Sequence, residues 1–244
     1  MRYAVVSDIH GNLPAFQTVL ADARPFDAIW CLGDLVGYGP NPNECIELLL
    51  DYPHLCIAGN HDWGAIGRSE MMVFNQEARQ ALVWTQGILH PENRQFLTEL
   101  PSTYRPQNGD FLLAHGSPRE PIWEYLLDVD RAKASFLAYK FQIAFVGHTH
   151  LPFTYEWLEK SQEARLLLPN LDEPINLEGR RLILNPGSVG QPRDGDPRAS
   201  YGILDTEAQT WQARRVPYPV EITQERMRVR QLPERLISRL EVGR

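Results

Sequence analysis

Short apolar runs alternate with amphipathic stretches through the first half of the chain. The runs typical of β-strands are Tyr3–Ser7, Asp27–Leu32 and Leu55–Ala58. Apolar residues at helical spacing predict helices at Leu13–Ala23, Pro42–Leu50 and Asn75–Leu89. This rhythm predicts a largely parallel sheet, because parallel neighbours need helical crossovers between them.

The second half of the chain has shorter apolar runs that lie closer together. Asp110–Ala114 and Ile143–Val146 flank a helical stretch near Arg131–Tyr139. Five further strands are expected at Phe153–Trp157, Ala164–Leu168, Arg181–Leu184, Tyr201–Leu204 and Thr210–Val216. Turn residues separate these five runs, so we expect antiparallel strands that complete a second sheet. The segment from Glu221 to Leu240 has a helical pattern that Pro233 interrupts.

Composition and continuity favour a single α/β domain. Of the 244 residues, 43% are hydrophobic and 23% are charged, which is ordinary for a globular protein and excludes a disordered chain. The sequence has no Gly/Ser-rich linker and no internal repeat. We therefore expect one domain over residues 1–244, with two sheets and a helical tail from about residue 220.

Charge and cysteine content limit the partners and the cellular location that we expect for the protein. A net charge of −7 argues against long nucleic acid as a partner, although a bound metal can locally reverse the field for a nucleotide. No apolar run reaches the ~18 residues that span a bilayer, and the first run ends too early, at Ser7-Asp8, for a secretory signal. Cys31, Cys45 and Cys56 form no CxxC pair, which favours a reducing, cytoplasmic location.

Five of the seven histidines lie in short motifs rich in Gly, Asp and Asn. The motifs are Asp8-Ile9-His10-Gly11-Asn12, Gly33-Asp34, Gly59-Asn60-His61-Asp62, His115-Gly116 and Gly147-His148-Thr149-His150. Each follows a strand-like run, and the carboxyl ends of parallel strands meet in one crevice where ligands bind. The pairs Asp8-x-His10 and His148-x-His150 place both members on the same side of an extended segment. We therefore expect these side chains to face one centre.

The chemical types of these side chains indicate metal binding. Carboxylate, imidazole and one amide oxygen, without thiolate, suit Mn, Fe, Co, Ni or Zn. Two Asp, one Asn and four or five His exceed the three protein ligands of a typical catalytic zinc. The surplus points to two metals that share a carboxylate, an arrangement suited to displacement at phosphorus.

The five motifs in this order resemble the calcineurin-like metallophosphoesterases, in particular their small bacterial phosphodiesterase and phosphatase branch. Asn185-Pro186-Gly187-Ser188 is similar to a segment late in those members, so the resemblance runs from Asp8 as far as Tyr201. It implies a four-layer α/β/β/α sandwich of two mixed sheets flanked by helices. It also implies two divalent metal ions per chain, with Mn as the first choice and Fe, Ni, Co or Zn as alternatives.

The resemblance further implies a role for each motif residue. One metal would be held by Asp8, His10 and His150, the other by Asn60, His115 and His148, and Asp34 would bridge both. His61 would be the catalytic histidine that protonates the leaving alkoxide or holds the scissile phosphoryl oxygen. A metal-bound hydroxide would attack phosphorus in line.

One departure from the protein Ser/Thr phosphatase branch bears on the substrate. That branch follows its bridging aspartate with Asp-Arg-Gly, in which the aspartate orients the catalytic histidine and the arginine contacts phosphate. Gly37 and Tyr38 stand at those two positions here, and Asp62 stands where that branch has glutamate. Phosphoprotein phosphatase activity is therefore not expected, and the means of orienting His61 stays open.

Weaker candidates for substrate binding are Asn12, Tyr38, Arg119 and Arg193. Asn12 has a sufficient structural role as the cap of the first predicted helix. For the two arginines, a solvated loop charge is the alternative. Tyr38, like Trp123 and Tyr125, can stack on a nucleobase or simply pack.

The leading hypothesis is a dinuclear metal-dependent phosphoesterase acting on a small, nucleotide-type phosphodiester, phosphomonoester or phosphoanhydride. The first alternative is a catalytically silent binding or scaffold protein of the same fold, which would be expected to have lost a ligand or His61. The second is a mononuclear zinc hydrolase acting on an amide, against which Asn60 argues. The sequence predicts neither the native metal pair nor the oligomeric state.

Overall fold

The computed structural model of the chain describes residues 1–106, 110–171 and 173–244. The helices are α1 (Leu13–Asp22), α2 (Pro42–Leu50), α3 (Asn60–Ala65), α4 (Gln76–Ile88), α5 (Pro91–Glu99), α6 (Val129–Ala138), α7 (Val220–Val229) and α8 (Glu234–Ser238). Short 3-10 helices lie at Met71–Val73 and Arg239–Glu241.

The described strands form two six-stranded sheets. The first contains β1 (Arg2–Val6), β2 (Ala28–Cys31), β3 (His54–Cys56), β9 (Ile175–Asn176), β11 (Ala199–Asp205) and β12 (Thr210–Val216), in the order β3-β2-β1-β11-β12-β9. The second contains β4 (Thr103–Tyr104), β5 (Phe111–Ala114), β6 (Ile143–Phe145), β7 (Pro152–Leu158), β8 (Glu163–Leu167) and β10 (Leu182–Pro186), in the order β4-β5-β6-β10-β7-β8.

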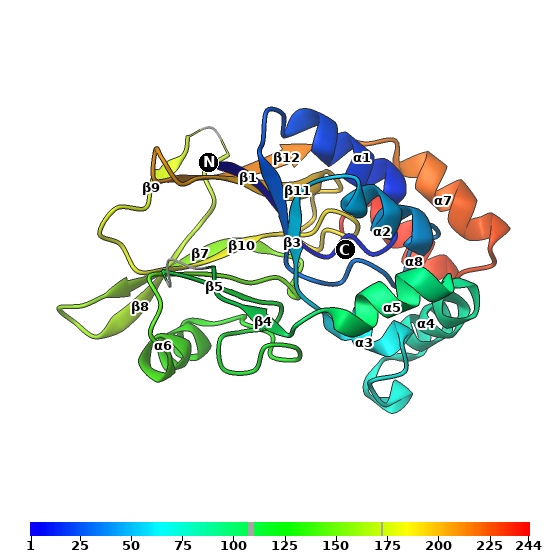
Figure 1. Cartoon of the computed structure of the whole chain (residues 1–244), viewed down its shortest axis with the longest axis horizontal. Coiled ribbons are helices and arrows are strands. Elements are labelled where there is room, and N and C mark those ends of the chain that lie inside the picture. The colour runs from blue at the N-terminus through cyan, green and yellow to red at the C-terminus, as the bar shows by residue number, and fades with distance from the viewer. Residues whose placement is uncertain (107–109, 172) are drawn as a thin grey trace.

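The sheets lie face to face with helices on their outer sides, which confirms the predicted sandwich of two mixed sheets (Figure 1). Alternate residues of the inner strands point into different cores. Val5 packs with Leu184 between the two sheets, whereas Val6 packs under α1 and α2. Ile183, next to Leu184, packs against Phe136 of α6 on the far side of the second sheet. Burial on both faces explains why these strands are continuous apolar runs.

The parallel part of the first sheet was predictable, and its antiparallel part was not. β1 pairs in parallel with β2, and β2 with β3, as the strand–helix rhythm indicates. The prediction that the later strands complete the second sheet is wrong for β11 and β12. β11 pairs antiparallel with the remaining edge of β1, and β12 pairs with β11. Spacing along the chain predicts a hairpin but not the sheet edge on which the hairpin is placed.

Some elements were missed because they are short or polar. α3 has six residues, too few for a periodic pattern, and it begins within the Gly-Asn-His-Asp motif. α5 carries mostly polar residues and buries only Asn93 and Leu97. β4 and β9 contain two residues each. Among the described residues, no helix is long and apolar enough to cross a membrane.

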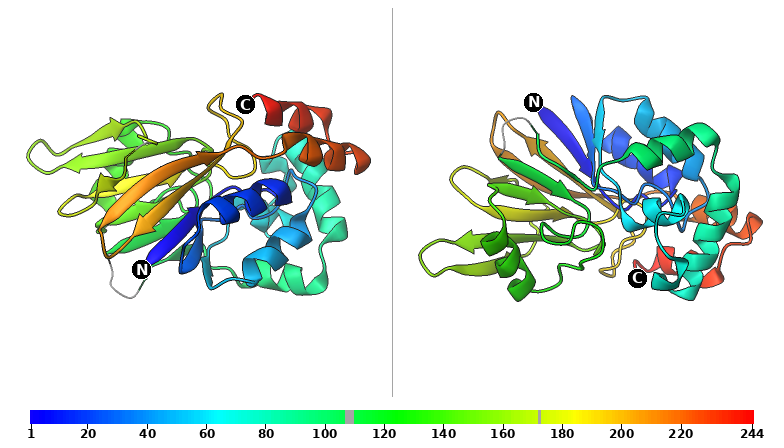
Figure 2. Two further views of the ribbon diagram at one scale, coloured as in Figure 1. Left: turned by 90° about the horizontal axis from the view of Figure 1, so that it is seen from above. Right: turned by 60° about the horizontal axis from the view of Figure 1, so that its bottom comes forward.

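The C-terminal segment after β12 folds back over the loop that follows β10 (Figure 2). The amide of Gly195 in that loop donates to the carbonyl of Gly243 at 2.8 Å. Arg239 donates to the side-chain oxygen of Gln191 at 3.3 Å. The tail is therefore helical and broken near Pro233, as predicted, and it also contacts a loop close to the site described below.

Gly202 of β11 offers a test of the packing between neighbouring strands. A Cβ added there would lie 2.0 Å from Cη2 of Trp211 on β12. That indole is 3% exposed and packs against Phe145 of the other sheet at 5.3 Å between ring centroids, so it cannot move aside cheaply. We expect Gly202→Ala to lower the free energy of unfolding by about 1–3 kcal/mol, measured by urea denaturation.

Gly87→Ala in α4 is the matched control. Nothing lies within 4 Å of a Cβ added at Gly87. Alanine there restricts the unfolded chain without a clash, so we expect stabilisation by about 0.4–1 kcal/mol. Equal effects of the two substitutions would contradict the packing argument.

Candidate metal centre

The predicted ligands meet at the carboxyl ends of the inner strands. Two groups of buried side chains have ligand atoms within 4.8 Å of one another: Asp8, His10 and His150 in the first, and Asp34, His115 and His148 in the second. They come from the loops after β1, β2, β5 and β6. Strand ends on both sheets thus supply one centre, as the motif positions predict.

The first group is closely packed and has a free carboxylate oxygen. Nε2 of His10 lies 3.1 Å from Nε2 of His150. Oδ1 of Asp8 lies 3.3 Å from the His150 nitrogen and 3.9 Å from the His10 nitrogen. That oxygen is buried and has no hydrogen-bond partner. A buried, unpartnered carboxylate oxygen is costly unless a cation compensates it, so these three residues fit a metal ion.

The second group adds an amide oxygen. Nε2 of His115 lies 3.3 Å from Oδ2 of Asp34 and 3.2 Å from Oδ1 of Asn60. Nε2 of His148 is buried without a hydrogen-bond partner. Carboxylate, amide oxygen and imidazole together suit a divalent transition metal. Asn60, predicted as a ligand, therefore stands beside the residues that it was expected to join.

Asp34 lies between the two groups. Its Oδ2 is 3.3 Å from Nε2 of His115 and 3.7 Å from Nε2 of His10. Its other oxygen, Oδ1, accepts the backbone N–H of His61 at 2.8 Å. One carboxylate therefore faces both groups, which is the position that a shared ligand requires.

Backbone carbonyls determine which nitrogen of each imidazole faces the centre. Nδ1 of three histidines lies close to a main-chain oxygen: His10 to Val36 at 3.2 Å, His115 to Leu32 at 2.8 Å and His150 to Gln191 at 2.5 Å. An N–H at Nδ1 that donates to a carbonyl leaves the lone pair of Nε2 available to a metal. Two of these carbonyls flank Asp34 in the chain, so the loop after β2 supplies a ligand and also orients two others.

Burial keeps most of the imidazoles neutral. It lowers the pKa of His148 to about 3 and the pKa of His10 and His150 well below the usual value. Burial also disfavours the charged form of His115, but the Asp34 carboxylate outweighs it and raises the pKa of His115 to about 10. A metal ion bound beside Asp34 would displace that proton, because imidazole ligates as the neutral base.

Backbone strain concentrates at this centre. Of the nine described residues other than glycine with positive φ, six lie at this centre, with φ between 51° and 64°: Asp8, His10, Asp34, Tyr38, His148 and His150. Each such residue costs about 1–3 kcal/mol, and it persists only where its surroundings determine it. The amides of Asp8 and His10 donate to the carbonyls of Gly33 and Asp34 at 3.1 and 2.9 Å. These bonds tie the first two motif loops together and offset part of the strain.

Asp62 organises the loop of Asp34, a role that the sequence did not reveal. Its carboxylate accepts the backbone N–H of Asp34 at 2.8 Å, of Gly59 at 2.9 Å and of Val36 at 3.2 Å. Burial, reinforced by the nearby Asp34, raises the pKa of Asp62 to about 7. The only sequence signal was its position three residues after Gly59, which is where an acidic residue caps a helix.

The Asn-Pro-Gly-Ser segment supports the centre from the end of β10. The Asn185 amide donates to the carbonyl of Gly147 at 2.8 Å. The Ser188 hydroxyl donates to the carbonyl of Asp8 at 2.8 Å. This segment therefore links the first and last motif loops, although it contributes no side chain to either group of metal-ligating type.

His61 is oriented by aromatic side chains. Its ring centroid lies 4.2 Å from that of Tyr38, 4.8 Å from His10 and 5.2 Å from Phe74. Burial lowers its pKa to about 4, and its Nδ1 has no partner. A Cβ at Gly37 would lie 2.6 Å from that nitrogen. A side chain at position 37 would therefore clash with the imidazole of His61.

The weaker candidates separate into two kinds. Tyr38 lies in the centre, and Nη2 of Arg193 lies 3.4 Å from its hydroxyl. The Asn12 side chain caps α1 and bonds to Gly190, Tyr218 and Thr223. Arg119 pairs with Glu124 and is 36% exposed. Tyr38 and Arg193 lie with the predicted ligands, Asn12 lines a small cavity with His10 but its side chain already has these structural partners, and Arg119 lies apart.

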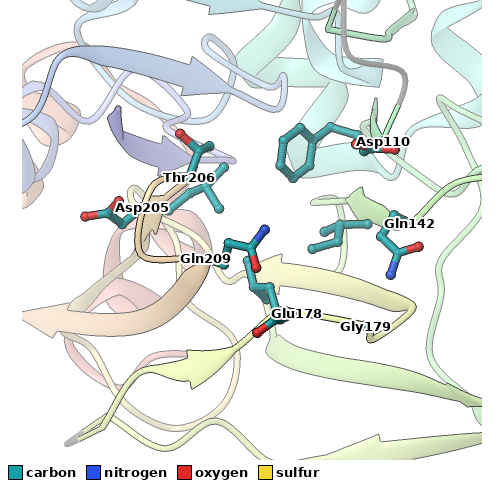
Figure 3. A pocket seen from close by; sticks show the side chains of 11 residues that line it. Asp110, Gln142, Glu178, Gly179, Asp205, Thr206 and Gln209 are labelled. Carbon is teal, nitrogen blue, oxygen red and sulfur yellow. The ribbon is translucent and has the colours of Figure 1, made fainter.

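A separate cavity lies at the other end of the sheets (Figure 3). It has a volume of about 410 Å³ and is lined by residues that include Asp110, Glu178 and Asp205. Asp110 and Gln142 precede β5 and β6, whereas His115 and His148 follow these strands. This cavity therefore has no part in the metal centre.

Three comparisons relate the chain to known proteins. Residues 1–209 match the model of the calcineurin-like phosphoesterase superfamily domain. The uncharacterized protein MJ0912 of Methanocaldococcus jannaschii is 41% identical over 246 residues, covering 99% of this chain and 98% of that protein. Phosphodiesterase YfcE of Escherichia coli K12 is 27% identical over 219 residues, covering 85% and 89%. The crystal structure of a metallophosphoesterase from Sphaerobacter thermophilus is 44% identical, with a TM-score of 0.91 and coverage of 100% and 99%.

Metal removal tests the two ligand groups. A protein is stabilised by an ion that binds only its folded state, by about 2.7 kcal/mol when the ion is at 100 times its Kd. We expect Mn²⁺ to raise the Tm of chelator-treated protein, measured by scanning calorimetry. Asp34→Asn should lose most of that rise, because it removes charge from both groups.

His90→Gln is the control for this experiment. The His90 side chain is 59% exposed and lies outside both groups. Its variant should keep the full increase in Tm on addition of Mn²⁺. An increase in Asp34→Asn as large as in the unsubstituted protein would show that the ions bind elsewhere.

Proposed function

The chain belongs to the calcineurin-like phosphoesterase superfamily and is a metal-dependent phosphoric ester hydrolase, and we propose that it uses two divalent ions on a small nucleotide-type substrate. The observation that carries this proposal is the Asp34 carboxylate, which faces both groups of buried ligands. Two ions that share a carboxylate are suited to displacement at phosphorus. We propose further that residues 1–244 act as one domain.

In the proposed centre, Asp8, His10 and His150 would hold one ion, Asn60, His115 and His148 would hold the other, and Asp34 would be shared. Mn²⁺ is our first choice for both. Bound ions of this kind polarise the phosphoryl group and make water a nucleophile at neutral pH. Every ligand position is filled, and so is His61, which argues against a catalytically silent scaffold.

The side chains around the ions have distinct roles in this proposal. His61, packed against Tyr38, donates a hydrogen bond to a phosphoryl oxygen or a proton to the leaving oxygen. Arg193 lies beside Tyr38 and supplies positive charge for the phosphate. The strained loops hold the ligands rigidly before substrate binds, so little reorganisation is needed during reaction.

The substrate is proposed to be a phosphodiester or phosphoanhydride of nucleotide type. Support comes from the likeness to phosphodiesterase YfcE and from Tyr38 and Tyr125, whose rings lie beside the predicted ligands. Tyr125 is 44% exposed and its ring stacks on that of His148 at 3.8 Å between centroids, so an aromatic surface lies next to a predicted ligand. The buried, unpaired Cys31, Cys45 and Cys56 support a reducing, cytoplasmic setting.

A substrate panel tests this proposal. We expect Mn²⁺-loaded protein to hydrolyse an aryl phosphodiester or diadenosine tetraphosphate with a higher kcat/KM than the matching aryl phosphomonoester. The measurement is the initial rate on each member at one metal concentration. Turnover of none of the three by protein with confirmed bound metal would overturn the proposed function.

His61→Ala tests the catalytic histidine. Loss of a positioned proton donor typically costs 10²–10⁴-fold, so we expect kcat/KM for the preferred substrate to fall by at least about 100-fold. Bound metal, measured by elemental analysis, should remain as in the unsubstituted protein, because the ring of His61 is in neither ligand group. His90→Gln should retain full activity. An equally active His61→Ala protein would remove His61 from the mechanism.

A further inference from the structure

A cavity of about 340 Å³ adjoins the metal centre. Its lining includes Tyr38 and Tyr125, and each of these rings also contacts a predicted metal ligand. The Tyr38 centroid is 4.6 Å from that of His10, in the first group, and the Tyr125 centroid is 3.8 Å from that of His148, in the second. The two tyrosines therefore lie between this cavity and the predicted ligands His10 and His148.

Positive charge gathers in this cavity. Arg193, Arg235 and Arg239 line it, and Glu77 is the only carboxylate among its described lining residues. Glu77 lies 3.3 Å from Arg235. We call these four side chains, with the two tyrosines, the arginine pocket. Three guanidinium groups against one carboxylate leave a local excess of positive charge in a chain whose net charge is −7.

Two of the three arginines share one neutral acceptor. Arg193 and Arg239 donate to the same acceptor, Oε1 of Gln191, at 2.9 and 3.3 Å. Arg239 also donates to the main-chain carboxylate of Arg244, which is not among the lining residues of the pocket. Within the described part of the chain, neither arginine forms an ion pair with a carboxylate side chain. Burial, together with the neighbouring Arg193, lowers the pKa of Arg239 to about 10. An anion bound between these two arginines would reduce the repulsion between their charges.

Two of the three arginines lie after the residues that match the family model. The match ends at residue 209, whereas Arg235 lies in α8 and Arg239 begins the last 3-10 helix. The tail that carries them is docked on the loop of Arg193 (Figure 2). Part of the charge of the pocket thus comes from the C-terminal tail, rather than from the five motifs.

We propose that the arginine pocket binds a second, non-reacting phosphate of the substrate while the first phosphate lies at the metal centre. This inference rests on the proposed function, since it assigns the second phosphate to the same molecule. Guanidinium groups match phosphate geometry and stay charged, so they recognise such a group well. The pocket then favours substrates with two separated phosphates over esters with one.

A ladder of synthetic esters tests this proposal. The probes are p-nitrophenyl phosphodiesters of linear alkanediols with two to six carbons, each ending either in a free hydroxyl or in a second phosphate. Initial rates with Mn²⁺-loaded protein give kcat/KM for each pair. We expect the phosphate-ended ester to be preferred by about tenfold or more at the best chain length, as for a charge-assisted hydrogen bond.

The double variant Arg235→Gln/Arg239→Gln should lose most of that preference, and Arg193→Gln should reduce it. Arg228→Gln is the control, because Arg228 lies on the same tail, is 53% exposed and pairs with Glu234 outside the pocket. It should keep the full ratio. No preference at any chain length, or a preference that survives in the double variant, would overturn the arginine pocket as a phosphate site.

A binding measurement separates this proposal from the proposed function. If the unsubstituted protein hydrolyses neither series, the proposed function fails, and calorimetric binding of the alkanediol bisphosphates then decides the inference. Tighter binding of a bisphosphate than of the matching monophosphate, lost in Arg235→Gln/Arg239→Gln, supports the pocket. Equal binding of the two ligands refutes it.

Discussion

The buried carboxylate of Asp34 lies between the two ligand groups. The contacts around it hold it in that position. One oxygen faces His10 and His115, and the other accepts the amide of His61. Its own amide is held by Asp62, and carbonyls on either side of it orient two imidazoles. A buried negative charge needs compensation, which His115 supplies as a proton and a metal pair would supply more fully. The loop after β2 is therefore both a ligand and the frame of the site.

The rest of the fold stabilises the strained backbone of that loop. Asp34 and its counterparts adopt left-handed backbone conformations, which only rigid surroundings can maintain. Each motif loop begins at the end of a strand that is buried on both faces by the sandwich. The antiparallel β11 then closes the remaining edge of β1, so the strand that leads to Asp8 has a neighbour on either side. The double burial of the sheets and the strain of the loops are thus parts of one arrangement.

Much of this could be predicted from the sequence, because strand periodicity and motif chemistry are local. The βαβαβ half and the gathering of the motif histidines follow from local pattern, whereas the two mixed sheets were implied by the resemblance to the metallophosphoesterases. The edge taken by β11 could not be predicted, since pairing between residues almost 200 positions apart leaves no local signal. The bonds of Asp62 and the aromatic packing of His61 were equally hidden, because both depend on groups that only the fold brings together.

The C-terminal arginines are a second feature that could not be predicted from the sequence. In the sequence, Arg235 and Arg239 are two charges on a polar helical tail, and a solvated surface is the ordinary interpretation. Their proposed role in binding phosphate depends on two contacts. Gln191 accepts a hydrogen bond from Arg239 and so links it to the loop of Arg193, and Tyr38 contacts Arg193 beside the metal centre. The chain is acidic, yet Glu77 is the only carboxylate side chain among the described residues that line the pocket. In this proposal the metal centre acts on one phosphorus atom, and the arginine pocket selects the substrates that carry a second phosphate.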